Sequence, residues 1–261
     1  MPRSLSLTGR ILTRLWLPVV LAAAWWVSSA GSTSLYFPPL SKILAAVWTQ
    51  WAAGPARAQL ASSLEHLVTG YALACLLGVG FGALLWSLRH VRDATSPYVY
   101  FLYVLPAPVL VPAAMTLFGL GFSMKVVLIA FAAMWPVLLN TLDGMRGVDP
   151  VALDTARALG VPPARRVLSV VLRAASPQIA AGLRNSLQVA IILMVVSEWV
   201  ASTDGIGYYI VNSQESFDYT GMWSGIIVLA IIGTVANLAF VAAENRILHW
   251  HYGARAVEGA R

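Results

Sequence analysis

The chain has 261 residues, of which 59% are hydrophobic and only 11% are charged, and its mean hydropathy is +0.74. A soluble domain carries about 25% charged residues, so the composition excludes an ordinary soluble protein and predicts an all-α protein that crosses a membrane several times. The net charge of +6 would suggest nucleic-acid binding in a soluble protein, but in a membrane protein basic residues mark the cytoplasmic side, and we expect no nucleic-acid partner.

Residues 1–14 form a basic arm, and an apolar segment follows over 15–30. A basic arm before an apolar run that ends in small residues is also typical of a cleaved signal peptide. Because many further apolar segments follow, we expect an uncleaved first transmembrane helix after a cytoplasmic arm. The transmembrane domain then extends over 15–252, with a short cytoplasmic tail at 253–261.

An amphipathic connector is predicted over 32–62. Pro38 and Pro39 form a turn, a short helix is expected over 42–51, and Gly54-Pro55 ends it. We expect this helix to lie at the outer membrane surface.

Further apolar segments approach the length of about 20 residues that a transmembrane helix needs. With the first segment they predict six spans, the later ones over 64–88, 98–120, 124–141, 177–201 and 222–243. Gly78 and Gly82 form a pair of small residues four apart, which allows two helices to approach closely. Prolines in the third and fourth segments predict bends, since they free backbone carbonyls.

The segment 149–177 is the longest charged run and carries strong local helix signals. Asp149 can cap a helix, Pro150 suits its first position, and Gly160 suits its end. A second short helix is predicted after Pro162-Pro163, and Ser176-Pro177 is predicted to begin the next span. The chain therefore leaves the membrane here, forms two short helices joined at a glycine, and returns.

The basic residues predict the orientation. With both termini in the cytoplasm, only three of the 17 Lys and Arg residues, namely Lys42, Arg57 and Lys125, fall outside. This asymmetry agrees with the positive-inside rule and puts 149–177 in the cytoplasm.

The segment 149–177 resembles the coupling loop of permease subunits of ATP-binding-cassette importers. In that family a Glu-Ala-Ala triplet is followed by a glycine and then by an aliphatic pair before a proline. The corresponding residues here are Asp154, Thr155, Ala156, Gly160, Val170 and Leu172. Arg173 occupies the usual proline position, and Pro177 is expected to take part of that role.

Other blocks are similar to the nitrate, sulfonate and taurine class of these permeases, over roughly 15–252. They are Phe37-Pro38-Pro39-Leu40-Ser41, Val104-Leu105-Pro106, Phe118-Gly119-Leu120-Gly121, Gly182-Leu183-Arg184 and Gly205-Ile206-Gly207-Tyr208.

The resemblance implies the type I importer permease fold in a bacterial cytoplasmic (inner) membrane. It implies a homodimer of two permease copies, with a heterodimer left open. A cytosolic ATPase dimer would bind ATP–Mg and dock on the loop, and a periplasmic or lipid-anchored solute-binding protein would deliver the solute. The implied solutes are small and often anionic, such as nitrate, taurine or an alkanesulfonate.

The loop's spacing suggests how docking would work. Leu153, Ala156 and Leu159 recur at helical spacing and would form an apolar docking face. The alternative is an ordinary amphipathic helix at the membrane surface.

The sequence contains no ATP site or catalytic set of its own. Its two lysines do not follow a Gly-x-x-x-x-Gly, so a phosphate-binding loop is missing and ATP would bind another chain. The four histidines show no metal-ligand spacing, and Cys75 is the single cysteine. We therefore expect no cofactor in this chain and no enzymatic activity.

Candidate pathway residues are the polar side chains within the later spans: Asn140, Arg184, Asn185, Gln188 and Glu198. A carboxylate inside an apolar segment is costly and often functional, but Glu198 could equally be a hydrogen-bonded structural group. Arg184 could instead extend to the inner surface. An ion-coupled secondary transporter that uses Glu198 is the alternative function.

Overall fold

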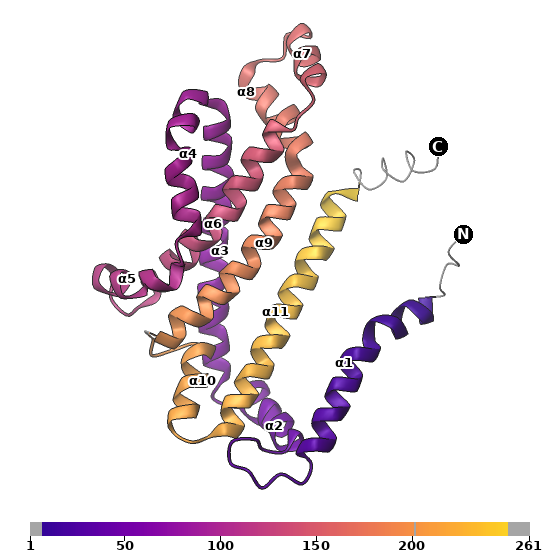
Figure 1. Cartoon of the computed structure of the whole chain (residues 1–261), viewed down its shortest axis with the longest axis vertical. Coiled ribbons are helices and arrows are strands. Elements are labelled where there is room, and N and C mark those ends of the chain that lie inside the picture. Colours follow the sequence, from indigo (N-terminus) through magenta and orange to yellow (C-terminus); the bar gives the residue numbers. More distant parts are fainter. Residues whose placement is uncertain (1–6, 201, 250–261) are drawn as a thin grey trace. The chain divides into compact units, whose positions relative to one another are not determined.

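The computed structural model describes residues 7–200 and 202–249, with the side chains of the first helix described from Trp16 onward. Within these ranges the chain forms helices, turns and loops and no strand (Figure 1). It divides into two compact units: Met1–Arg57 with Tyr209–Val228, and Ala58–Tyr208 with Leu229–Arg261.

The larger unit contains most of the long helices. In chain order it comprises α3 (Arg57–Ser87), α4 (Arg89–Val104), the 3-10 helix η2 (Ala107–Leu110), α5 (Val111–Phe118), α6 (Phe122–Arg146), α7 (Pro150–Ala158), α8 (Pro163–Arg166), the π-helix η3 (Val167–Val171), α9 (Leu172–Val200) and the part of α11 (Tyr219–Ile247) that follows Val228.

Helix α6 is the centre of this unit, and residues on all its sides are buried. Its cluster with α3 and α9 includes Ile129, Ala133, Ala74, Ala190 and Met194. A helix that is apolar all round must be enclosed by neighbours, which explains why the fold is built around this segment.

The close approach of α3 to α6 depends on the predicted glycine pair. A methyl group at Gly78 would lie 2.5 Å from Cβ of Val137, and one at Gly82 would lie 2.8 Å from Cβ of Thr141. Only the absence of a side chain lets the backbones come this near, so the prediction for these glycines is confirmed.

The predicted third span over 98–120 is not one straight helix. The chain bends by 88° between α4 and the segment Ala107–Phe118. Leu105 and Pro106 are both extended, because the residue before a proline is driven out of the α region and proline cannot donate the next helical hydrogen bond. The bend that the prolines of this segment predicted is therefore confirmed.

Among the described residues, four helices are long and apolar enough to cross a membrane, and the bent pair makes a fifth span if it counts as one. In the first helix, α1 (Leu7–Ser29), the apolar part Trp16–Ser29 is shorter. The six predicted segments thus correspond to these four helices, the bent pair and α1. Leu7–Arg14 of the predicted basic arm belongs to α1, and the predicted tail at 253–261 lies outside the described residues.

Ser176-Pro177 does not begin a helix, contrary to the prediction, because α9 starts at Leu172 and contains Pro177. Pro177 cannot donate to the carbonyl of Arg173, and the hydroxyl of Ser176 does so instead at 2.8 Å. Ser96 and Pro97 repeat the arrangement inside α4, where the Ser96 hydroxyl donates to the carbonyl of Asp93 at 3.3 Å. In each pair the serine satisfies the carbonyl that the proline leaves free.

The smaller unit is held together by aromatic side chains. It contains α1, α2 (Leu40–Ala46), the π-helix η1 (Val47–Ala52), α10 (Ile206–Glu215) from Tyr209 onward and the start of α11. The Trp51 indole donates to the Ser224 hydroxyl at 3.1 Å and packs edge-on against Tyr209. The predicted connector helix therefore exists as α2 with η1, and Trp51 anchors it.

Candidate functional site

The loop between α6 and α9 begins with the predicted cap. The side chain of Asp149 accepts a hydrogen bond from the backbone N–H of Val151 at 2.8 Å, and Pro150 occupies the first helical position of α7. The first N–H groups of a helix have no acceptor within the helix. Asp149 supplies one for Val151, and Pro150 has no N–H that would need one. Figure 1 shows α7 and α8 beyond the ends of α6 and α9.

Gly160 ends α7 in a left-handed conformation, with φ of +72°. The N–H of Val161 donates to the carbonyl of Ala156 at 3.0 Å, and the N–H of Gly160 donates to that of Arg157 at 2.9 Å. This is the Schellman arrangement, which requires a residue that tolerates positive φ. The predicted two short helices joined at a glycine are thus present.

The predicted apolar docking face is wrong in part. Ala156 is buried, and Leu153 packs against a cluster that includes Met145, Val148 and Val171 of this chain. The helix needs these side chains to hold α7 against the ends of α6 and α9. The exposed large apolar side chains here are Val151 and Leu159, and they flank an exposed ion pair in which Arg157 Nη1 lies 2.7 Å from Asp154 Oδ1.

The remaining loop residues lie where the chain re-enters the helical bundle. The Thr155 hydroxyl donates to the carbonyl of Val151 at 2.8 Å. Val170 lies in η3 and is half-buried, Leu172 begins α9 beside the same cluster, and Pro177 lies within α9. Arg173 is exposed.

Glu198 is fully buried and accepts three hydrogen bonds. The Ser63 hydroxyl and the N–H of Gly207 donate to Oε2 at 2.8 and 3.0 Å, and His66 Nδ1 lies 3.0 Å from Oε1. These three partners satisfy the carboxyl group with hydrogen bonds in an apolar interior. We call Ser63, His66 and Glu198 the Glu198 cluster.

The Glu198 cluster also fixes the turn that follows α9. The Ser63 hydroxyl accepts from the N–H of Ile206 at 2.8 Å, and the side-chain carbonyl of Gln59 accepts from the N–H of Gly205 at 2.7 Å. Gly205 has φ of +103°, and a methyl group there would lie 2.2 Å from the Glu198 carboxyl carbon. The turn therefore needs glycine at this position.

A second ion pair stabilises the same turn. Lys125 of α6 is buried and donates to the carboxylate of Asp204, which also accepts from the Ser202 hydroxyl at 3.0 Å. Burial by itself raises the pKa of Asp204, but the hydrogen bonds from Lys125 and Ser202 outweigh it, and the pKa lies below its usual value.

The structure does not bring all of the predicted pathway residues to one place. Asn185 and Gln188 share one exposed stripe of α9 with Gln178, at helical spacing, whereas Glu198 faces the protein interior. Gln178 donates to the Asn140 side-chain carbonyl at 2.9 Å, which links the stripe to α6. Glu198 lies about 20 Å along α9 from Arg184, at 1.5 Å per residue.

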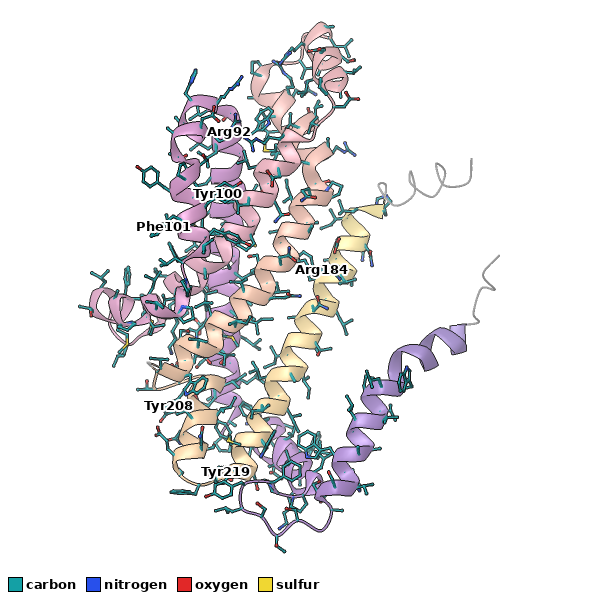
Figure 2. The ribbon with its side chains drawn as sticks, viewed as in Figure 1. Arg92, Tyr100, Phe101, Arg184, Tyr208 and Tyr219 are labelled. Atoms are coloured by element: carbon teal, nitrogen blue, oxygen red, sulfur yellow. The ribbon has the colours of Figure 1, made fainter. Side chains whose placement is uncertain are left out.

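Arg184 lies beside this stripe and is partly exposed, with Nη1 3.9 Å from Glu244 Oε2 (Figure 2). The sequence reasoning missed Gln178, Ser63 and His66. A signal was present for two of them, because Ser63 and His66 are three residues apart and share one face of a helix. Among the described residues, no group of three or more His, Cys, Asp or Glu side chains could hold a metal ion.

The chain is similar to known proteins over most of its length. The family model described as "Binding-protein-dependent transport system inner membrane component" matches residues 70–249. A putative aliphatic sulfonates transport permease protein of Bacillus subtilis, SsuC, is 29% identical over 90% of this chain and 86% of its own. The taurine transport system permease protein TauC of Escherichia coli is 29% identical over 89% of this chain and 87% of its own.

Two solved structures are similar in fold. The MetNI methionine ABC transporter in an inward-facing conformation matches with a TM-score of 0.59 and 17% identity, covering 74% of this chain and 95% of the matched chain. A bacterial ABC transporter involved in the import of the acidic polysaccharide alginate matches with a TM-score of 0.56 and 15% identity, covering 91% and 98%.

Proposed function

The chain belongs to the family of inner membrane components of binding-protein-dependent transport systems, and we propose that two copies of it form the pathway through which a small anionic solute is imported. A cytosolic ATPase dimer binds ATP–Mg and docks on the two loops that contain α7 and α8. A solute-binding protein delivers the solute to the opposite end of the membrane helices. Both termini lie in the cytoplasm, on the same side as α7.

The capped and glycine-terminated α7 is the observation that supports ATPase coupling. Asp149 and Gly160 fix both ends of the helix, and Ala156 seats it against the chain's own core. A helix held in this way moves as a rigid body and can transmit a push to α6 and α9. Its exposed groups, Val151, Leu159 and the Asp154–Arg157 pair, are those that a docked ATPase would contact.

The exposed amide stripe of α9 supports a pathway between two copies. Asn185 and Gln188 lie at membrane depth on the outside of a single chain. Amide groups exposed to hydrocarbon are costly, so we infer that a second copy and an aqueous pathway cover them. A homodimer supplies such a pathway with two copies of the stripe.

Sulfonates are the proposed solute class because SsuC and TauC are similar over most of the chain. A sulfonate carries one delocalised negative charge and three acceptor oxygens. Amide N–H groups on the stripe and the partly exposed Arg184 can donate to such an anion.

The decisive experiment is co-purification of the detergent-solubilised chain with the ATPase encoded beside it. Asp154→Arg should weaken the complex, because it reverses the charge at the exposed pair. Asp143→Arg is the matched control, since Asp143 is also exposed and paired three residues from an arginine but lies outside the loop. Equal losses in both variants, or no complex with the unaltered chain, would contradict the proposed coupling.

The ion-coupled alternative is not favoured. Glu198 is fully buried and is occupied by three hydrogen-bond donors, which suits an anchor more than a group that exchanges ions with solvent.

A further inference from the structure

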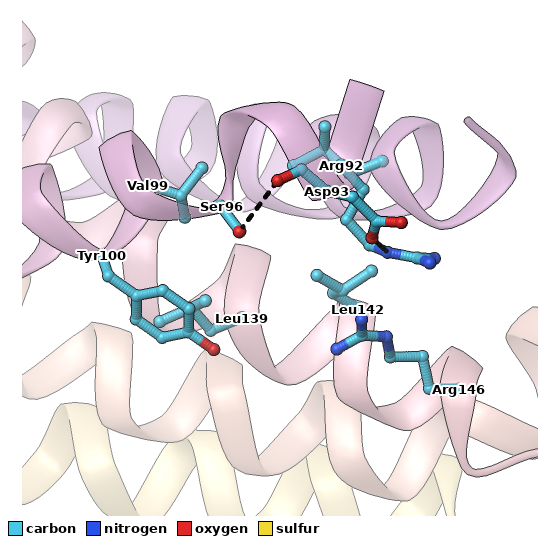
Figure 3. Close-up of a pocket in the computed structure, with 9 residues that line it drawn as sticks. Arg92, Asp93, Ser96, Val99, Tyr100, Leu139, Leu142 and Arg146 are labelled. Carbon is cyan, nitrogen blue, oxygen red and sulfur yellow. Dashed lines mark hydrogen bonds and ion pairs between the residues drawn. The ribbon is translucent and has the colours of Figure 1, made fainter. Parts of the chain in front are cut away.

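A hollow of about 170 Å³ lies between α3, α4 and α6 at the end of these helices nearest α7 (Figure 3). Its polar side chains come from two helices: Arg92, Asp93, Ser96 and Tyr100 of α4, and Arg146 of α6. Figure 3 shows Ser96 and Tyr100 on one side of the hollow and Arg146 on the other. Figure 2 places Arg92 and Tyr100 along α4.

The mouth of the hollow carries a net positive charge. Asp93 Oδ1 lies 3.2 Å from Arg92 Nε, and its other oxygen lies 3.8 Å from Arg89 Nε, so one carboxylate is shared by two guanidinium groups. Arg146 Nη1 lies 3.9 Å from Asp143. Of these residues only Arg92, Arg146 and Asp93 line the hollow, so two arginines face one aspartate there. The terminal amino groups of the Arg92 side chain, which is only 14% exposed, are not used in its contact with Asp93 through Nε.

An apolar groove of about 270 Å³ continues from the hollow, and the two share Leu85 and Val99. Its other lining residues are Phe81, Thr95, Met134, Trp135 and Leu138. The Thr95 hydroxyl donates to the carbonyl of Val91 at 2.8 Å, and Trp135 Nε1, which has no hydrogen-bond partner among the described residues, is buried and not exposed at the groove surface. The groove therefore suits a hydrocarbon chain.

The lengths also agree with one membrane leaflet. Arg146 and Met134 both lie on α6, and twelve residues of helix span about 18 Å. Half of a hydrocarbon core of about 30 Å is about 15 Å. A charged group at the hollow thus lies at the membrane surface when the groove extends toward the midplane.

We propose that this site binds an anionic phospholipid, with its phosphate in the hollow at Arg92 and Arg146 and one acyl chain in the groove. Basic pockets between membrane helices recognise lipid head groups through charge, and the adjoining groove adds apolar contact that a free phosphate cannot use. The lipid holds α4 against α3 and α6, where α4 has no buried residue of its own.

The test measures how much phosphatidylglycerol remains on the purified full-length chain after incubation with an equal mixture of phosphatidylglycerol and phosphatidylcholine and a detergent wash. The unaltered chain should retain phosphatidylglycerol in preference. Arg146→Gln should lower the affinity of the chain for phosphatidylglycerol about fivefold, since each basic residue near a membrane surface contributes roughly 1 kcal/mol. The double variant Arg92→Gln with Arg146→Gln should lower it about 25-fold, because the two losses multiply. Arg146 is half-exposed, so the single variant should fold even if the double variant does not.

Two further variants separate the sources of binding. Arg173→Gln removes an exposed charge at the same end of the helices. Because Arg173 lines neither the hollow nor the groove, this variant should retain the lipid as the unaltered chain does. Thr95→Trp fills the groove, which Thr95 lines without lining the hollow, and keeps every charge, so it should lose the lipid. The proposal is overturned if the unaltered chain shows no preference for phosphatidylglycerol, or if Arg146→Gln and Arg173→Gln behave alike. It is also overturned if Thr95→Trp retains the lipid while inorganic phosphate displaces it, because the head group alone would then account for binding.

Discussion

The carboxylate of Glu198 lies 3.0 Å from Nδ1 of His66, although the two residues are separated by 132 positions in the chain. Both side chains are buried, and the contact joins α9 to α3 at the end of the helices away from α7. The His66 ring also lies against Phe122, with 5.4 Å between the ring centroids. The Glu198 cluster therefore joins α3 and α9 around a single buried carboxyl group at this end of the larger unit.

Replacing His66 by alanine should destabilise the protein, because it leaves a buried carboxylate with one partner fewer. Leaving a buried acceptor without one of its donors costs about 1–3 kcal/mol, which should lower the Tm by roughly 2–10 °C in a chain of this size. Thermal unfolding of the detergent-solubilised chain measures this loss. Glu215→Gln, at an exposed carboxylate, is the control and should leave the Tm unchanged. A Tm unaffected by His66→Ala, with uptake abolished, would instead indicate a transport role for the cluster.

The lowered pKa of Asp204 predicts a pH dependence. A carboxylate whose folded pKa is depressed adds stability above its unfolded pKa of about 3.9, and this stability is lost as the pH falls through the folded value. The Tm of the unaltered chain should therefore exceed that of Asp204→Asn at pH 7, and the difference should shrink below about pH 4. A difference that stays constant down to pH 3 would show that the ion pair with Lys125 does not contribute.

Gly78 and Gly80 provide a matched pair for the packing of α3 on α6. A methyl group at Gly78 would lie 2.5 Å from Val137 and 2.8 Å from the Met134 carbonyl, whereas one at Gly80 would meet nothing within 4 Å. Gly78→Ala should destabilise by about 1–3 kcal/mol through overpacking. Gly80→Ala should be neutral or stabilise by up to about 1 kcal/mol, because alanine favours the helix. Equal effects on the Tm would refute the close approach.

Gly160 tests whether the shape of the loop matters for coupling. A Cβ atom at this position would have no atom within 4 Å beyond its own residue and the two neighbours in the chain. The energetic cost of a substitution therefore comes from the φ of +72°. Gly160→Val should strain the turn and weaken ATPase binding, since a β-branched residue disfavours positive φ. Gly160→Asn should have a smaller effect, because asparagine tolerates this conformation. ATPase pull-down from membranes with equal amounts of each variant gives the comparison, and an equal loss for both would contradict the conformational explanation.

Ser176 and Pro177 form a testable unit within α9. Ser176→Ala should destabilise by about 1 kcal/mol, because the carbonyl of Arg173 loses its donor. In a Pro177→Ala background the restored N–H of residue 177 can donate to the same carbonyl, so the serine substitution should then have little effect. Additive losses in the double variant would show that the hydroxyl serves another purpose.

The sequence predicted those features that depend on local signals. The Asp149 cap, the Gly160 terminus and the glycine pair on α3 each follow from a residue type at a defined position, and the structure contains all three. The prolines of the third segment predicted the bend after α4, but its size of 88° could not be predicted, because hydropathy carries no information on backbone direction. Ser176-Pro177 was misassigned as a helix start because the compensating hydroxyl bond is not visible in composition.

The partners of Glu198 could not be predicted because they depend on tertiary packing. Ser63 lay between the predicted connector (32–62) and the predicted span (64–88), whereas α3 begins at Arg57 and contains it. Leu153 and Ala156 were predicted to face a docked ATPase, whereas they pack against this chain's own core, for a related reason. Helical spacing identifies an apolar face but not the surface that covers it. In both cases the missing information is the contact between distant segments.

The buried position of Lys125 has a practical consequence for chemical labelling. The chain has only two lysines, and Lys42 is exposed while Lys125 is enclosed in its ion pair with Asp204. An amine-directed reagent will therefore modify the folded protein at the Lys42 side chain and leave Lys125 intact. Adduct formation at Lys125, read by mass spectrometry of the digested chain, then reports when the turn after α9 opens, without any engineered probe.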